Sequence, residues 1–297
     1  MVVSNGKPEA AVALLIINQI PDLPALSINS ILQNSDSPVY IGTVRDQDRE
    51  GIPKNNRINF VDLSMEASRL AISLNGGAYE SFAEDAFFSL VQLKWALFRK
   101  VFEITQSDFL IYSDIDVFWL RPVLPDLLDA FEKLPATQVM VQHFSWIPGQ
   151  PQLCMGFVAL RSGKYVDILI DSASALHAQL LIKDPRSGDD DVITEIYRRE
   201  NFPIEMQLLP QTTFPVGNLL NLFARRDQFP GLHPFTPYIF HANFVVGLAK
   251  KLMITRIAYK QHNLSFSSVR VRKRIAIRFK LFIYKTYFKF RTIVKSE

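Results

Sequence analysis

The sequence predicts an α/β fold in which a mostly parallel central sheet is flanked by helices. Through the first half of the chain, short apolar runs typical of strands alternate with segments that carry apolar residues at helical spacing. Such alternation favours parallel strands, because each intervening helix carries the chain back to the same end of the sheet. The composition agrees: 48% of the 297 residues are hydrophobic and 21% are charged, so the chain can bury a sizeable core.

Each element of the first half is identified by its own pattern. Strands are expected where short apolar runs are bounded by polar or turn-forming residues. Helices are expected where apolar residues recur every three or four positions, and the first of them follows a proline turn. The predicted strands span residues 12–17, 39–44, 58–61 and 109–112, with a short continuation at 117–120, and the predicted helices span 23–33 and 82–103.

The second half is less regular and is expected to add a smaller region to the same domain. The predicted strands there span 139–142, 157–159 and 238–240, the predicted helices span 163–181 and 191–199, and the proline-punctuated segment 208–218 is expected to be a loop. We place one domain at residues 10–262 and a separate tail at 263–297.

The C-terminal tail differs from the domain in charge. Residues 265–297 hold ten Lys or Arg and one acid, interleaved with Phe, Tyr and Ile. The whole chain carries +4, so removing the +9 of the tail leaves about −5 on the domain, which argues against a nucleic-acid-binding domain surface. We expect the tail to lie as an interfacial helix on an anionic membrane. The alternatives are a basic arm for nucleic acid and a helix packed on the domain.

Cysteine content and the N-terminal segment bear on the compartment. The single cysteine, Cys154, excludes an internal disulfide and a cysteine-cluster metal site. The apolar run at 10–17 is too short to span a bilayer and has no basic flank or cleavage site, so we expect no secretory signal. We therefore expect a cytoplasmic protein that is peripheral on the inner face of a membrane if the tail binds lipid.

An acidic pair, Asp114 and Asp116, directly follows the predicted strand at 109–112. In extended backbone, residues i and i+2 point to the same side, so both carboxylates can face one point. Two such carboxylates repel each other unless a cation lies between them, and a divalent metal suits oxygen ligands. Such a metal also stabilises a leaving diphosphate. Alternatively, the two Asp side chains have a purely structural role and cap a strand-end turn. The flanking apolar runs instead favour a buried partner for the charges.

Four segments resemble, in order, the nucleotide-diphospho-sugar transferase family of glycosyltransferases, which has the GT-A fold. The segments are Leu93-Lys94-Trp95, the run from Leu110 to Pro122 with the acidic pair, Gly188-Asp189-Asp190-Asp191, and His241-Ala242-Asn243 with the later Gly247, Lys250 and Lys251. The resemblance covers roughly residues 10 to 255, and the Asp-x-Asp and His-x-Asn motifs are its specific parts. It implies a Rossmann-like domain that transfers a sugar from a nucleotide-diphosphate sugar to a hydroxyl acceptor.

The resemblance also implies roles for individual residues. A metal ion, Mn²⁺ or Mg²⁺, would be held by Asp114, Asp116 and His241. Asp189 and Asp190 would lie beside the donor sugar as the catalytic candidates. The nucleotide-sugar donor, for which a UDP-sugar is expected, would be contacted by Asn18, Gln19, Lys94, Ser113, Asp114, Asp116, Gly247, Lys250 and Lys251. Apart from the resemblance, Trp146 and the segment 212–214 are candidates for the acceptor side, where a glycan or a lipid-linked acceptor is expected to bind.

Three departures from the family pattern concern the sugar site. Asp190 stands where Gln is usual, Thr194 stands where Asn is usual, and Cys154-Met155-Gly156 replaces Asn-x-Gly. Relatives with this motif set mainly retain the anomeric configuration, so retention is expected. Two routes stay open: Asp190 acts as a nucleophile in a double displacement, or the leaving phosphate deprotonates the acceptor on the same face.

Two other functions, and purely structural roles for several of these residues, are alternatives. A phosphatase of the haloacid-dehalogenase type also uses Asp-x-Asp after an apolar strand, although usually on its first strand. A catalytically dead sugar-nucleotide-binding fold acting as an interaction protein is the non-enzyme alternative. Acids at 189–191 can simply complement a helix dipole, His241 can be a satisfied core histidine, and Lys94 can be a solvated helix lysine.

Overall fold

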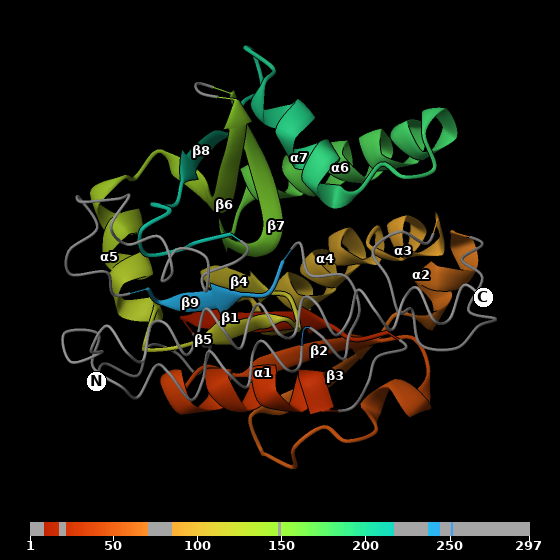
Figure 1. Cartoon of the computed structure of the whole chain (residues 1–297), viewed down its shortest axis with the longest axis vertical. Helices are drawn as coiled ribbons and strands as arrows, with labels where there is room; N and C mark the ends of the chain where they lie inside the picture. The colour runs from red at the N-terminus through yellow and green to blue at the C-terminus, as the bar shows by residue number, and fades with distance from the viewer. Residues whose placement is uncertain are drawn as a thin grey trace, which may run out of the picture.

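A central sheet with helices on both faces organises the computed structural model of the chain (Figure 1). The structure describes residues 9–17, 22–70, 85–147, 150–216, 237–243 and 251. The predicted tail at 263–297 lies outside these residues, as do the first residues of the helix predicted at 82–103.

Seven strands form the main sheet, and most of their pairings are parallel. In sheet order the strands are β3 (Ile58–Asp62), β2 (Val39–Thr43), β1 (Ala10–Leu15), β4 (Phe109–Ser113), β7 (Gln150–Arg161), β6 (Thr137–Ile147) and β8 (Glu205–Leu208). The pairs among β1, β2, β3 and β4 are parallel, as is β6 with β8, whereas β7 runs antiparallel to both β4 and β6. The predicted mostly parallel α/β sheet is therefore confirmed.

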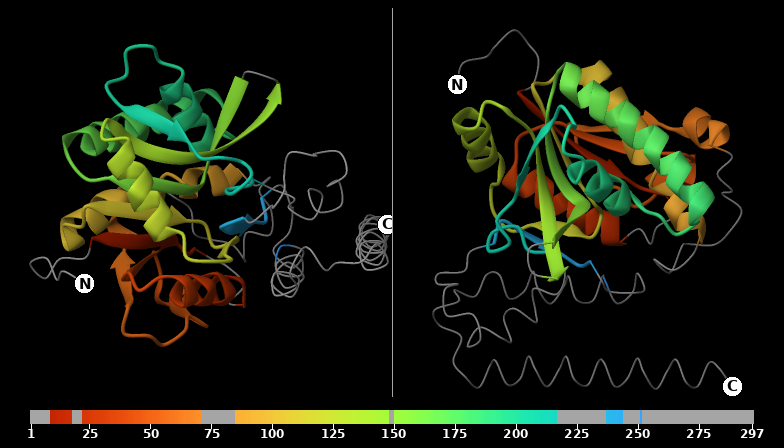
Figure 2. Two further views of the ribbon diagram at one scale, coloured as in Figure 1. Left: turned by 90° about the vertical axis from the view of Figure 1, so that its left-hand side faces the viewer. Right: turned by 90° about the horizontal axis from the view of Figure 1, so that it is seen from above.

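Both faces of the sheet are buried, as the apolar runs require. Along β1, Ala11 and Ala13 belong to one core cluster and Val12 and Leu14 to the other. The first cluster is covered by α4 (Leu93–Thr105), α6 (Lys164–Lys183) and α7 (Asp189–Tyr197), which lie together in both views of Figure 2. The second is covered by α1 (Asp22–Asn34) and α5 (Leu124–Lys133). The carboxyl ends of β1 and β4 thus lie between two helical layers.

Helix α6 also meets the length and composition of a membrane span, with a mean hydropathy of 1.2 in its most apolar window. Its Val166, Ile170 and Ala173 side chains are buried in the first core cluster. This pattern fits a helix that packs on the domain.

The long helix predicted at 82–103 is wrong where the structure describes it. The segment forms two helices, α3 (Asp85–Leu90) and α4, and Val91 and Gln92 form a turn between them. The carbonyls of these two residues accept the amides of Lys94 and Trp95 at 3.1 and 3.2 Å, which is the tight i→i−3 pattern. The turn places Lys94 in the first turn of α4, where its side chain is buried.

The predicted continuation of the fourth strand at 117–120 is also wrong. The chain turns after Asp114, whose carbonyl accepts the amide of Val117 at 3.0 Å. The following residues form a separate strand, β5 (Val117–Trp119), which pairs antiparallel with β9 (Ile239–His241). This small second sheet brings the chain around residue 240 to the end of β4, as Figure 1 shows.

Four short elements were not predicted from the sequence: η1 (Asp46–Arg49), α2 (Ser64–Arg69), α5 and β8. Helix α5 has a proline in its first turn and buries Leu124, Leu127 and Phe131 at helical spacing, so its signals were present. Strand β8 carries only a partly buried alternating pattern and pairs at the edge of the sheet with β6.

Candidate functional site

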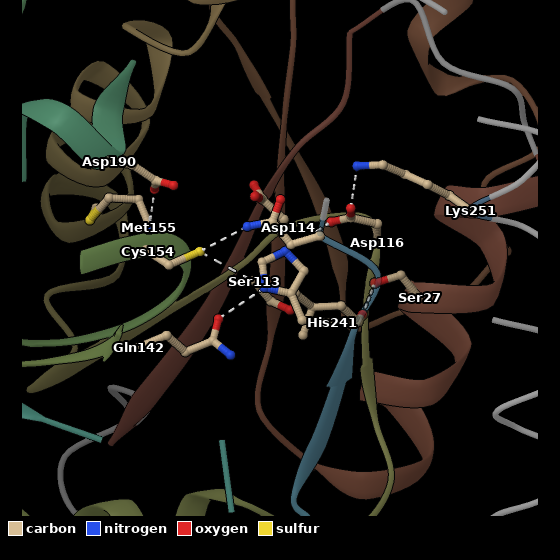
Figure 3. Close-up of polar contacts among 12 residues, drawn as sticks. Ser27, Ser113, Asp114, Asp116, Gln142, Cys154, Met155, Asp190, His241 and Lys251 are labelled. Atoms are coloured by element: carbon tan, nitrogen blue, oxygen red, sulfur yellow. Dashed lines mark hydrogen bonds and ion pairs between the residues drawn. The ribbon is translucent and has the colours of Figure 1, made fainter. Parts of the chain in front are cut away.

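Three segments distant in the sequence converge at the end of β4. The amide of Asp114 donates to the carbonyl of Gly156 in β7 at 2.7 Å, and the carbonyl of Asp116 accepts the amide of Ala242 at 2.9 Å. In the second sheet, Val117 stands opposite His241. One ligand atom from each of Asp114, Asp116 and His241 lies within 4.8 Å of the other two (Figure 3).

Asp116 is buried and surrounded by basic groups. Its Oδ2 accepts from Lys251 Nζ at 2.5 Å, and its Oδ1 lies 3.4 Å from His241 Nε2. Burial acts to raise the pKa of Asp116, but Lys251 and His241 outweigh burial and hold that pKa well below its usual range. The side chain is therefore an anionic carboxylate, which is the form that binds metal ions.

Asp114 is the more exposed member of the pair and is held by two donors. The Tyr112 hydroxyl donates to Oδ1 at 2.7 Å, and Lys94 Nζ lies 3.0 Å from the same oxygen. Burial and the Asp114 charge raise the pKa of Tyr112 well above its usual value, so the phenol stays protonated and keeps donating. Tyr112 was not predicted as a site residue, because an aromatic side chain within an apolar strand gives no sign of which group its hydroxyl meets.

Lys94 joins the acidic pair to the acids at the start of α7. Its buried Nζ lies between Asp114 and Asp189, at 3.0 and 2.6 Å. Burial acts to lower the pKa of Lys94, but the two carboxylates reverse this and hold the pKa well above its usual value. Lys94 is thus a permanent cation inside the site, and the alternative of a solvated helix lysine is excluded.

The three acids at the start of α7 have different surroundings. Asp191 Oδ2 accepts the amide of Gly188 at 2.9 Å, so its role is that of a helix cap. Asp189 faces Lys94, and Asp190 Oδ1 accepts the amide of Met155 at 2.6 Å. Burial and the neighbouring Asp189 charge raise the pKa of Asp190 well above its usual value. Asp189 therefore contacts the lysine that also holds Asp114, and Asp190 contacts the backbone of β7.

The imidazole of His241 is buried among close neighbours. Gln142 Oε1 lies 3.1 Å from Nδ1, and Cys154 Sγ lies 4.0 Å from the same nitrogen. A Cβ at Gly156 would lie only 2.1 Å from the ring carbon Cε1, so only glycine allows this approach. Gln142 was not predicted to touch the site, and Gly156 entered the prediction only as part of the segment that replaces Asn-x-Gly. Figure 3 shows Gln142 directed at the ring.

Several predicted site residues are placed differently or lie outside the described residues. Ser113 is fully buried, and its hydroxyl accepts from Trp119 Nε1 at 3.3 Å. Thr194, which stands where the family has Asn, accepts the amide of Leu153 at 2.9 Å and so holds β7 against α7. The predicted contacts that lie outside the described residues are Asn18, Gln19, Gly247, Lys250 and the side chain of Trp146.

The donor set fits a divalent cation. Two carboxylate oxygens and one imidazole nitrogen form a mixed oxygen and nitrogen set, which suits Mn²⁺ better than Ca²⁺. The ammonium groups of Lys94 and Lys251 lie against the same two carboxylates and add the positive charge that an anionic diphosphate requires. The cluster is thus able to hold a metal ion together with a phosphorylated ligand.

Comparisons with known proteins point the same way. The model of the family described as nucleotide-diphospho-sugar transferase matches residues 72–254. The galactosyltransferase LgtC, solved with donor and acceptor sugar analogues, is 13% identical with a TM-score of 0.58, over 89% of this chain and 99% of that one. A glycosyltransferase involved in glycosylation of the major capsid of PBCV-1 is 9% identical with a TM-score of 0.54, over 84% and 100%.

A third solved structure, the glycosyltransferase GlyE of Streptococcus pneumoniae TIGR4, is 14% identical with a TM-score of 0.50, over 87% of this chain and 62% of that one. At these identities the likeness concerns the fold, which is that of GT-A glycosyltransferases, as predicted. No sequence among the curated proteins matches this chain.

Proposed function

Because this chain belongs to the nucleotide-diphospho-sugar transferase family, we propose that it is a metal-dependent glycosyltransferase whose cation is held by Asp114, Asp116 and His241. The family and the fold make it a glycosyltransferase that uses a nucleotide-sugar donor. The proposal adds the metal, Mn²⁺ or Mg²⁺, and a donor that is a UDP-sugar carrying a hexose or a pentose. The observation that carries the proposal is the convergence within 4.8 Å of three ligand atoms from two distant segments, two from the turn at 114–116 and one from His241.

The bound cation would neutralise charge on the leaving diphosphate. The lysines of the chain act on the same charge by electrostatics. Lys251 is partly exposed and pairs with Asp116, so its ammonium group can turn from the carboxylate to a phosphate oxygen. Lys94 is buried and pairs with both Asp114 and Asp189. It therefore fixes the position of a proposed metal ligand relative to the acid proposed to lie beside the sugar.

Transfer with retention of configuration is also part of the proposal. Asp190 is tethered to the Met155 amide, and its raised pKa keeps the carboxyl protonated to higher pH than an ordinary Asp. A protonated carboxyl is a poor nucleophile, so these features favour same-face transfer, with Asp189 steadying the developing positive charge on the sugar. On this route, Asp190→Asn is expected to keep near-normal turnover. Loss of turnover in an Asp190→Asn chain that is otherwise intact supports the double displacement.

Donor binding can be tested without knowing the sugar. Thermal unfolding of the full chain is followed with UDP or GDP, with and without Mn²⁺. Stabilisation by nucleotide only when Mn²⁺ is present supports the metal-dependent donor site. Stabilisation by Mg²⁺ and phosphate mimics instead favours the phosphatase alternative. Slow hydrolysis of one member of a nucleotide-sugar panel then distinguishes an active enzyme from a dead fold.

The basic tail at 265–297 is the basis for proposing that the protein binds a membrane surface. Ten cationic residues interleaved with aromatic ones within 265–297 favour adsorption of the chain to an anionic cytoplasmic membrane surface, where a lipid-linked acceptor is within reach. The test compares the full chain with a full-length variant in which four tail cations are replaced by Gln: Arg270, Arg272, Lys273 and Arg274. Co-sedimentation with phosphatidylserine vesicles should fall in the variant. Equal binding of both chains would remove the membrane from the proposal.

A further inference from the structure

Gln142 is a fully buried polar residue in β6 that is in contact with a proposed metal ligand. We propose that Gln142 is a positioning residue: its side-chain oxygen holds the ring proton of His241 on Nδ1 and so leaves Nε2 free to bind the cation. The inference rests on the proposed metal site, and it adds a residue that selects the binding-competent form of the histidine ligand.

The orientation of the Gln142 amide is fixed by its other partners. Its Nε2 donates to the carbonyl of Pro215 at 3.0 Å and to that of Phe214 at 3.4 Å. In the reverse orientation the amide oxygen would face the carbonyl oxygens of Phe214 and Pro215, and neither of these can donate a hydrogen bond. The amide oxygen therefore faces His241 Nδ1, and a hydrogen bond across the 3.1 Å gap requires the proton to be on Nδ1.

The segment that holds the amide is itself anchored. The ring of Phe214 stacks on Tyr238 with centroids 5.2 Å apart and packs against Phe157 at 5.4 Å. Within β6, the register of the pairing with β7 shifts between Val141, opposite Val158, and Gln142, opposite Cys154. Gln142 is thus clamped between a fixed loop and the histidine.

A competing acceptor makes this control necessary. On the other side of the ring, Asp116 Oδ1 lies 3.4 Å from Nε2 and would accept a proton carried there. A proton on Nε2 would occupy the lone pair that a metal needs, because a histidine ligand binds through an unprotonated ring nitrogen. In metal sites, a hydrogen bond on the remote nitrogen commonly sets the tautomer in this way.

The other neighbours of the ring do not replace Gln142. Cys154 Sγ is 4.0 Å from Nδ1, a weak contact at most, and it already accepts from Asn243 Nδ2 at 3.4 Å. Gly156 lies so close to the His241 ring that it limits where the ring can sit, but it has no side-chain polar group that could bond to the ring. Gln142 is therefore the described side chain that distinguishes Nδ1 from Nε2.

The direct test is to observe the tautomer in the metal-free full-length chain. Long-range ¹H–¹⁵N NMR of histidine-labelled protein distinguishes the two ring nitrogens, and the signals of His241 are those lost in His241→Gln. At a pH at which the His241 ring carries a single proton, the unmodified chain is expected to hold that proton on Nδ1. A single proton on Nε2 overturns the inference without reference to any variant.

A substitution then tests the cause. Gln142→Met keeps the side-chain volume but cannot accept a hydrogen bond, so the proton is expected to move to Nε2 and the Kd for Mn²⁺, measured by electron paramagnetic resonance, to rise about 10- to 100-fold. Gln207→Met, the same change at an exposed position on β8, is the matched control and should alter neither. A folded Gln142→Met chain with unchanged tautomer and Kd overturns the role of Gln142. An unmodified chain with the proton on Nδ1 that binds no Mn²⁺ overturns the proposed metal site instead.

Discussion

Replacing Gly156 by alanine tests how closely the fold fits His241. The added Cβ would lie 2.1 Å from Cε1, 2.7 Å from Nε2 and 3.0 Å from Nδ1 of the imidazole. Carbon atoms in ordinary contact are about 3.5–4.0 Å apart. The ring must therefore move by more than about 1 Å, whereas metal–ligand distances tolerate only about 0.2 Å.

The expected result for Gly156→Ala is a loss of metal binding that exceeds its loss of stability. Overpacking a core costs about 1–3 kcal/mol, which urea unfolding would measure. The Mn²⁺ affinity is expected to fall by about 100-fold or more, because a ligand is displaced together with its hydrogen bond to Gln142. Calorimetric titration with Mn²⁺ measures this loss.

A matched control is available on the other side of the site. A Cβ at Gly188 would come no closer than 3.4 Å to its nearest neighbour, Phe88, so Gly188→Ala should bind Mn²⁺ as the unmodified chain does. If Gly156→Ala also binds Mn²⁺ with unchanged affinity, the ring is not confined as the structure shows, and the reasoning is refuted.

Three further substitutions probe the charges around the site. Lys94→Met leaves Asp114 and Asp189 without their shared cation, so urea unfolding near pH 8 should show a loss of about 3 kcal/mol. An unchanged free energy of unfolding contradicts this. Tyr112→Phe removes a hydrogen bond to a charged oxygen and should cost about 2 kcal/mol by the same measurement, with a native circular dichroism spectrum. Asp190 has a raised pKa in the folded state, so its contribution to stability is present below its unfolded pKa and is lost as pH rises through the folded value. Asp190→Asn should therefore be more stable than the unmodified chain at neutral pH and equal to it in acid; the opposite trend contradicts the assignment.

The fold could be predicted from the sequence because its signals are local. The strand at 109–112 and the Asp pair after it are adjacent in the chain, so the position of the acidic pair could be predicted. The extended backbone expected across the pair is wrong, because Ile115 and Asp116 form a turn between β4 and β5. The apolar runs of β1 and β2 are continuous because helices cover both faces of the sheet, so they are strong strand signals.

What could not be predicted depends on contacts between distant segments. The separate strand β5 exists because β9, more than a hundred residues later, pairs with it, and no periodicity reports such a partner. The break between α3 and α4 contains neither proline nor glycine, so it carries no sequence signal. Gln142 reads as one polar residue in a strand, and only the fold shows that it meets His241.

The measurement that tests the central claim most directly is calorimetric binding of UDP to the full chain, with and without Mn²⁺, in the unmodified protein and in Asp116→Asn. The substitution keeps the shape of the side chain and removes the charge that Lys251 and His241 stabilise. Nucleotide binding that requires Mn²⁺ in the unmodified chain and is lost in the folded variant is the predicted result. Metal-dependent binding that survives in Asp116→Asn, or nucleotide binding by the unmodified chain that is indifferent to Mn²⁺, would contradict the assignment of the Asp114–Asp116–His241 cluster.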